Sequence, residues 1–230
     1  MNDQDFDRAL IAGVFDLAAA EGWSAVSVGA AARWAGLPLD RARLRFPLRS
    51  VILVRLGRMA DVAALSQPVA ELQTRERLFD ILMRRFDAMQ PYRAGIGTML
   101  RALPADPLHA GLLYATTLRS MAWMLEGAGI SSAGAMGTLR SHGLLAVWMA
   151  VTRTFVDDES EDLSSTMAAM DRALDKAEQA AGWLASRTGM STPEMDSDVT
   201  TYPETAAELA DAIPPLTPPP MPEPPASPPM

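Results

Sequence analysis

Apolar residues recur along most of this chain at the three- and four-residue intervals that place them on one face of an α-helix. Alternating apolar and polar runs rich in β-branched residues, which would indicate strands, are rare. The pattern predicts helices over residues 4–20, 28–35, 39–46, 48–65, from 74 onward, 108–126, 139–155 and 163–186, with a loop over 127–137. We therefore expect an all-α fold.

Local signals mark the ends of several of these helices. Gly22 and Gly36 each follow an apolar run, and glycine suits the left-handed conformation in which helices commonly end. Ser27 and Thr74 precede apolar runs and are expected to cap the helices that follow them. Trp23 is expected to pack back into the core of an N-terminal module.

The last predicted helix carries an apolar seam at alternating intervals of four and three, at positions 163, 167, 170, 174, 177, 181 and 184. Such a seam packs against another helix, either within the domain or in a second subunit. The acidic run 157–162 precedes it. We expect these acids to complement the helix dipole, with Asp162 or Ser164 as the cap, rather than to bind a metal.

Composition divides the chain into three parts. Residues 1–65 are expected to form a small helical module, and residues 66–188 a larger helical domain for ligand binding or dimerisation. Residues 189–230 hold twelve of the eighteen prolines. This Pro-rich tail is expected to be disordered or polyproline-like, because it lacks the apolar residues of a packed core. Docking of a partner is the alternative for the tail.

Few residues offer catalytic chemistry. The chain has no cysteine, and its two histidines, His109 and His142, lack metal-ligand spacing. Gly95 and Gly97 form a Gly-x-Gly without a preceding strand, so no phosphate loop is expected. We expect no enzyme activity, no cofactor and no metal. The acidic N-terminus and the lack of an apolar run of about 18 residues favour a cytoplasmic protein without a transmembrane segment.

Charge is distributed unevenly. The whole chain carries −8, yet residues 33–58 contain seven arginines and a single acid, Asp40, which gives that segment +6. A basic patch on an acidic protein indicates binding of a polyanion at that patch.

Methionine and tryptophan are frequent in the larger predicted domain. Methionine adapts to irregular apolar surfaces, so these side chains either fill an ordinary core or line a pocket for an apolar ligand. The candidate pocket residues are Met83, Met99, Met121, Trp123, Met124, Trp148 and Met149.

The stretch 25–49 resembles the DNA-binding segment of the TetR family of transcriptional regulators. The resemblance rests on Val26 and Val28, on the Ala-x-x-Ala-Gly turn at 32–36, and on Phe46-Pro47 after the third helix. It implies a helix-turn-helix that places residues 39–46 in the major groove. The candidate DNA-binding residues are Ser27, Leu39, Arg41, Arg43, Arg45 and Arg49. The alternative is a solvated arginine face that no longer binds DNA.

A second resemblance covers residues 8–184. This stretch is similar to the ubiquinone-biosynthesis accessory proteins, which share the TetR fold but bind lipid instead of DNA. Residues 35–47 and 158–172 carry this resemblance, although Met167 stands where that family usually has an aromatic residue. The sequence thus predicts a homodimeric DNA-binding regulator that responds to an apolar small molecule, with a lipid-binding accessory protein as the alternative.

Overall fold

The computed structural model describes residues 1–67 and 72–188 of the chain. Its α-helices are α1 (Asp3–Glu21), α2 (Val28–Trp34), α3 (Leu39–Arg45), α4 (Arg49–Leu65), α5 (Thr74–Met89), α6 (Arg93–Ala102), α7 (Pro107–Gly127), α8 (Gly134–Asp157) and α9 (Ser164–Thr188). Short 3-10 helices lie at Trp23–Ala25, Gln90–Tyr92 and Leu103–Ala105. The described residues contain no strand, so the predicted all-α class is confirmed.

The three N-terminal helices pack around buried side chains of α1, which belong to the same hydrophobic core as the helices that follow. Phe6, Leu10 and Val14 repeat every four residues along α1 and are fully buried. Trp23 is buried as predicted and stacks on Phe15, with 6.2 Å between the ring centroids. Gly22 ends α1 with a φ of 85°, a backbone conformation that side chains other than glycine rarely adopt.

Helix α1 also rests on α6, and the two backbones approach closely at Gly95. A Cβ atom added at Gly95 would lie 2.2 Å from the carbonyl oxygen of Phe15. The hydroxyl of Thr98 donates a hydrogen bond to the carbonyl of Ala18 at 3.0 Å. The Gly-x-Gly therefore lies in a helix, and its first glycine permits the close contact between α1 and α6.

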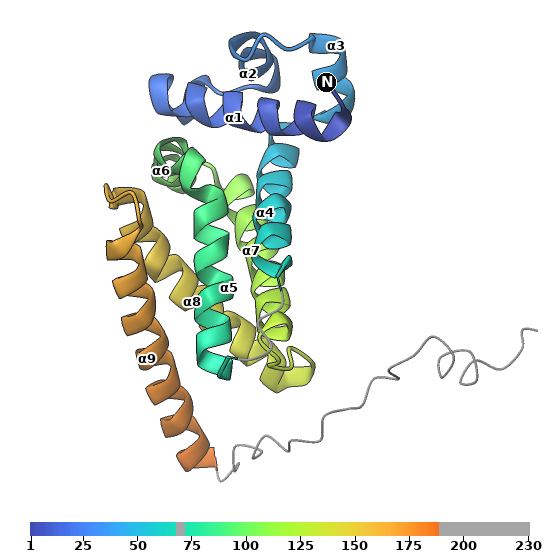
Figure 1. The fold of residues 1–230 in the computed structure, drawn as a ribbon. Helices are drawn as coiled ribbons and strands as arrows, with labels where there is room; N and C mark the ends of the chain where they lie inside the picture. Colours follow the sequence, from blue (N-terminus) through green and yellow to red (C-terminus); the bar gives the residue numbers. More distant parts are fainter. Residues whose placement is uncertain (68–71, 189–230) are drawn as a thin grey trace, which may run out of the picture. The chain divides into compact units, whose positions relative to one another are not determined.

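Helices α4, α5, α7 and α8 run beside one another below the N-terminal helices (Figure 1). Helix α4 begins directly after α3 and packs along both α5 and α7. Within residues 1–67 and 72–184, α4 is thus the helix that follows the helix-turn-helix directly and also packs inside the larger helical part. Among the described residues, no helix is long and apolar enough to cross a membrane.

Two local expectations differ from the structure. Gln73, not Thr74, is the cap of α5, where it forms a reciprocal capping box with Glu76. Helix α8 begins at Gly134, inside the predicted loop, because the small residues there serve close packing. A Cβ atom at Gly137 would lie 2.0 Å from the backbone of Ser132, so glycine is needed at that contact.

The acids before α9 act as helix caps. The buried carboxylate of Asp158 accepts hydrogen bonds from the amide and the hydroxyl of Thr166, at 2.8 and 2.6 Å. Asp162 accepts one from the amide of Ser164, as predicted, at 3.2 Å. Burial raises the pKa of Asp158, but the hydrogen bonds from Ser160 and Thr166 outweigh it and bring the pKa to about 2.

The apolar seam of α9 packs within its own domain along its first half. Leu163, Met170 and Leu174 are buried in the core, whereas Met167 and Ala181 are exposed. The predicted Pro-rich tail, residues 189–230, lies outside the described residues.

Candidate functional site

Helices α2 and α3 form a helix-turn-helix whose turn depends on one glycine. Ser27 caps α2 as predicted, since its hydroxyl accepts a hydrogen bond from the amide of Ala30 at 3.1 Å. Gly36 has a φ of 64°, and the next amide, of Leu37, donates to the carbonyl of Ala32 at 2.8 Å. This αL turn redirects the chain so that α3 starts at Leu39 on the surface.

The candidate arginines on α3 pair with acids of α1. Arg41 contacts Asp3, with 2.6 Å between guanidinium nitrogen and carboxylate oxygen. Arg45 contacts both Asp3, at 2.6 Å, and Asp7, at 2.5 Å. Arg55 from α4 also pairs with Asp7. The two acids and the two α3 arginines are each four residues apart, and this matched spacing was a signal for their pairing in the sequence.

These pairs hold the carboxylates in their charged form. The hydrogen bond from Arg41 and the charge of Arg45 hold the pKa of Asp3 below its usual value. Burial raises the pKa of Asp7, but Arg45 and Arg55 outweigh it, so this pKa is also lowered.

Arg49 at the start of α4 pairs across to α7. Its guanidinium lies 2.9 Å from Asp106, the cap residue of α7, and 5.1 Å above the ring of Trp23. Nδ1 of His109 lies 2.7 Å from the same carboxylate. Hydrogen bonds from His109 hold the pKa of Asp106 below its usual value.

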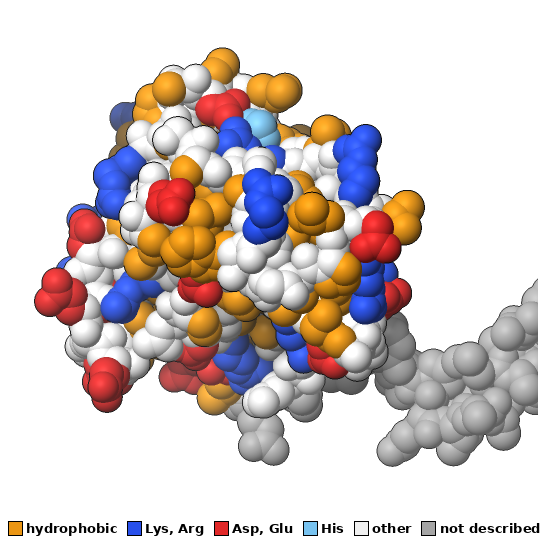
Figure 2. All heavy atoms as spheres, turned by 90° about the horizontal axis from the view of Figure 1, so that it is seen from above, with side chains coloured by type: hydrophobic (Ala, Val, Ile, Leu, Met, Phe, Trp, Pro, Cys, Tyr) orange, Lys and Arg blue, Asp and Glu red, His pale blue; other side chains and the backbone are white. Residues whose placement is uncertain are grey.

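The outer face of α3 is mixed rather than uniformly basic. Arg43 is exposed, and within the described residues it donates only to the carbonyl of Pro47, at 3.0 Å. On α3, Leu39 and Leu44 are 48% and 82% exposed, and Leu48, directly before α4, is 64% exposed. Figure 2, which looks onto the end of the molecule formed by α1–α3, shows hydrophobic and basic side chains interleaved on this face.

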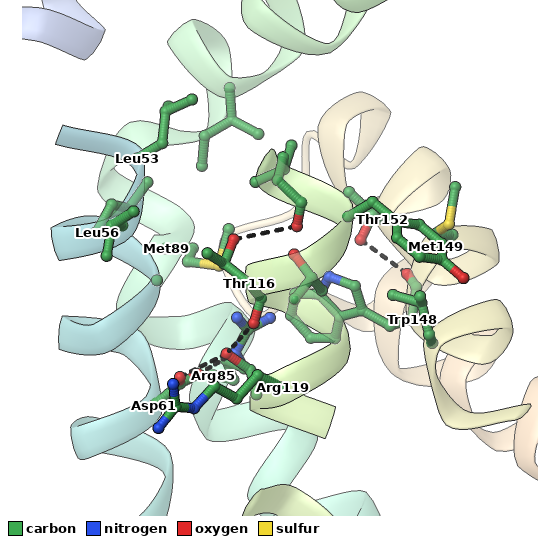
Figure 3. A pocket seen from close by; sticks show the side chains of 18 of the residues that line it. Leu53, Leu56, Asp61, Arg85, Met89, Thr116, Arg119, Trp148, Met149 and Thr152 are labelled. Carbon is green, nitrogen blue, oxygen red and sulfur yellow. Dashed lines mark hydrogen bonds and ion pairs between the residues drawn. The ribbon is translucent and has the colours of Figure 1, made fainter. Parts of the chain in front are cut away.

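A cavity of about 1260 Å³ opens between α4, α6, α7 and α8 and reaches α5. Four of the seven predicted pocket residues line it: Met99, Trp123, Trp148 and Met149. Trp148 lies deep and stacks on Phe86 with 4.1 Å between centroids, whereas Trp123 and Met149 are exposed at the mouth. Figure 3 shows Trp148, Met149 and Met89 around this space.

The other three predicted residues are absent from the cavity wall: Met83, Met121 and Met124. All three are buried in the core. On α7 the cavity is lined by Thr116, Thr117, Ser120 and Trp123. Met121 and Met124 follow Thr117 and Ser120 by four residues, on the same side of the helix, but lie past the cavity wall. Residue type favoured a pocket for all seven, but only four of them line it.

A buried ion pair forms the polar part of the cavity wall. Nε of Arg85 on α5 donates to Asp61 on α4 at 2.8 Å, and the hydroxyl of Ser120 donates to the same carboxylate at 2.6 Å. The guanidinium also lies 4.2 Å above the ring of Trp148. Desolvation lowers the pKa of Arg85, against the raising effect of Asp61.

Sequence reasoning did not identify Arg85. It lies four residues after Ile81 and three after Leu82, on the apolar face of α5, which was the available signal. Its neighbour Arg84 pairs instead with Asp80 and lies outside the cavity. Among residues 1–67 and 72–188, no cluster of His, Asp or Glu side chains is arranged to hold a metal ion.

Comparison with solved structures identifies the fold. The chain is similar to a TetR transcriptional regulator from Nitrosomonas europaea ATCC 19718, with 21% identity and a TM-score of 0.62, over 76% of this chain and 98% of that one. A TetR transcriptional regulator from Rhodococcus sp. RHA1 is also similar, with 16% identity and a TM-score of 0.52, over 76% and 97%. No protein-family model and no curated protein matches the chain. The protein therefore has the fold of TetR transcriptional regulators.

Proposed function

We propose that this protein is a DNA-binding transcriptional regulator whose affinity for its operator changes when an apolar small molecule occupies the cavity. The observation that carries this proposal is the course of α4. The helix starts at Arg49, immediately after the helix-turn-helix, and its residues Leu53, Gly57 and Asp61 line the cavity. A ligand that displaces α4 therefore also displaces α3.

The pair between Arg49 and Asp106 gives this coupling a second connection. It joins the first turn of α4 to the first turn of α7, and α7 supplies Thr116, Ser120 and Trp123 to the cavity. Through α4 and α7, binding of the ligand would then change the affinity for DNA, and binding of DNA would change the affinity for the ligand. Such coupling requires that the ligand bind one arrangement of these helices better than the other.

On DNA, α3 is proposed to enter the major groove, with Leu39 and Arg43 facing the bases and Ser27 at the backbone. Arg41, Arg45 and Arg49 would exchange their carboxylate partners for phosphates. A homodimer would present two such helices to the half-sites of one operator. Native mass spectrometry at micromolar concentration tests the dimer, and a monomer alone would contradict it.

The direct test is DNA binding measured by fluorescence anisotropy across a salt series, with the protein's own upstream region and a scrambled duplex. A regulator binds the first duplex selectively, and log K falls with log salt by about 0.9 for each phosphate contacted. Replacing both Arg41 and Arg43 with alanine should abolish selective binding. Arg172→Ala on α9, also an exposed arginine, is the matched control and should leave it unchanged.

The reciprocal variant Asp3→Asn/Asp7→Asn sharpens this test. It removes the carboxylate charges that pair with Arg41, Arg45 and Arg55. Tighter DNA binding with a steeper salt slope is expected. If neither the wild type nor this variant discriminates the two duplexes, the regulator assignment is wrong.

The second candidate function is a TetR-fold lipid-binding protein that does not bind DNA. Two features favour it: the intramolecular pairing of the α3 arginines, and the exposure of Leu44 at the centre of the presumed reading face. Under this alternative, gently purified protein carries a bound lipid in its native mass spectrum and shows no selective DNA binding.

A further inference from the structure

The cavity wall is basic although the protein is acidic. One arginine comes from each of four helices: Arg58 on α4, Arg85 on α5, Arg119 on α7 and Arg153 on α8. Asp61 is the only acid among the lining residues. In the chain as a whole, acids outnumber Lys and Arg by 28 to 20. An excess of positive charge inside a low-dielectric cavity attracts an anion.

Arg85 is the deepest of these cations and has unused donors. Its residue is 3% exposed, and its hydrogen bond within the described part of the chain is the one from Nε to Asp61. Arg85 lines the cavity, whose wall is mainly apolar. Its terminal N–H groups make no hydrogen bond with another described residue, so a ligand that supplies oxygen gains hydrogen bonds there without displacing a protein partner. Figure 3 shows Arg85 and Asp61 together at one end of the cavity.

The remaining arginines are available for the same purpose. Arg58, Arg119 and Arg153 are exposed, and none of them forms an ion pair or hydrogen bond with another residue of the described ranges. Beyond them the wall is apolar, with Leu53, Met99 and Trp148 buried. The arrangement is thus a deep apolar chamber with cationic groups at one buried point and around its opening.

We infer that the cavity binds an apolar carboxylic acid, with its carboxylate on the terminal nitrogens of Arg85 and its hydrocarbon or aromatic body among the apolar side chains. A carboxylate matches the planar edge of a guanidinium and accepts two parallel hydrogen bonds from it. The volume exceeds that of typical pockets for drug-sized ligands, so a long chain fits. This inference names the ligand class of the cavity used in the proposed function, and therefore rests on that cavity being a ligand site.

Binding of laurate and of 1-dodecanol, two ligands with equal chains and different heads, tests the inference. Each is titrated at neutral pH below micelle-forming concentration, and the fluorescence of Trp148 and Trp123 in the cavity wall reports occupancy. Laurate is expected to bind about 10-fold to 100-fold more tightly than 1-dodecanol, since hydrogen bonds to charged groups contribute on that scale. Equal affinities, or no binding of laurate, would overturn the inference.

Variants locate the carboxylate. Arg85→Gln should remove the preference for laurate and leave 1-dodecanol binding unchanged. The double variant Arg85→Gln/Asp61→Asn serves the same purpose without leaving a lone buried carboxylate. Arg84→Gln is the matched control, because Arg84 is the adjacent arginine on α5 and lies outside the cavity. If both Arg85 variants keep the preference for laurate, the inference fails.

One further titration defines the body of the ligand. Titration with 2-naphthoate shows whether the site takes an aromatic acid as well as a fatty acid, and loss of affinity for both in Arg85→Gln supports the carboxylate site. No DNA is present in these experiments. If the wild-type protein does not bind laurate, only the inference about the ligand class is refuted. If it does not bind DNA selectively, the proposed regulator function is refuted.

Discussion

Replacement of Gly95 by alanine should loosen the contact between α1 and α6. The new Cβ would lie 2.2 Å from the carbonyl oxygen of Phe15 and 2.8 Å from its carbonyl carbon. Backbone atoms cannot rotate aside as a side chain does, so one helix must move by about 1 Å to restore van der Waals separation. Phe15 and Ile96, both 1% exposed, would lose packing as a result.

The magnitude follows from two opposing effects. Alanine is favoured over glycine within a helix by about 1 kcal/mol. Overpacking a tight contact costs about 1–3 kcal/mol, and more where the backbone itself must shift. We expect Gly95→Ala to lower the free energy of unfolding by about 2 kcal/mol, which lowers the melting temperature by about 4–8 °C for a chain of this size.

Gly143→Ala is the matched control. Gly143 lies in α8, and a Cβ atom there would meet nothing within 4 Å. It should raise the free energy of unfolding by about 0.5–1 kcal/mol. Urea unfolding followed by circular dichroism measures both variants. A Gly95→Ala midpoint equal to or above that of the wild type would show that the backbone contact does not constrain this junction.

The remaining predictions concern charge and packing. Asp158→Ala should destabilise the protein by about 2 kcal/mol through loss of the cap of α9. The pKa of Asp158 falls from 3.8 to about 2 on folding. The contribution of this carboxylate to the free energy of unfolding is therefore present above pH 3.8 and lost as the pH falls towards 2. In acid unfolding, Asp158→Asn should show a weaker dependence of stability on pH. Met121→Ala should cost about 2–5 kcal/mol in urea unfolding, since Met121 is fully buried, whereas Met149→Ala at the cavity mouth should cost under about 1 kcal/mol. The effects of Arg49→Gln and Asp106→Asn on DNA affinity should be non-additive in a double-mutant cycle, and simple additivity would refute their coupling.

Hydrophobic periodicity and punctuation were sufficient to predict most helices. Gly22 and Gly36 follow the ends of helices, and both have a positive φ, which glycine adopts more readily than other residues. The predicted start of α8 was wrong, because a run of small residues indicates a loop when only the local sequence is considered. At Gly137 the same small size is needed for contact with Ser132, which only the folded arrangement shows.

The site was less predictable because it depends on how far the cavity extends along each helix and on partners distant in sequence. Met124 lies four residues after Ser120, on the same side of α7, yet Ser120 lines the cavity and Met124 is buried in the core. Arg85 resembles a surface residue beside Arg84, and Asp61, the partner that keeps it charged inside the protein, is 24 residues away. No local pattern connects these two residues.

The charge of a segment is not the charge that it presents to a partner. Residues 33–58 carry +6 in the sequence, yet Arg41, Arg45, Arg49 and Arg55 are all paired with acids outside that segment. DNA binding through these arginines must release carboxylates while it gains phosphates, so each exchanged contact contributes less than a free arginine would. Since the pKa values of Asp3 and Asp7 are lowered, these acids stay charged at neutral pH and compete throughout. For the proposed regulator, this competition should give weak affinity for nonspecific DNA, and operator affinity should then depend mainly on the proposed contacts of Leu39 and Arg43 with the bases.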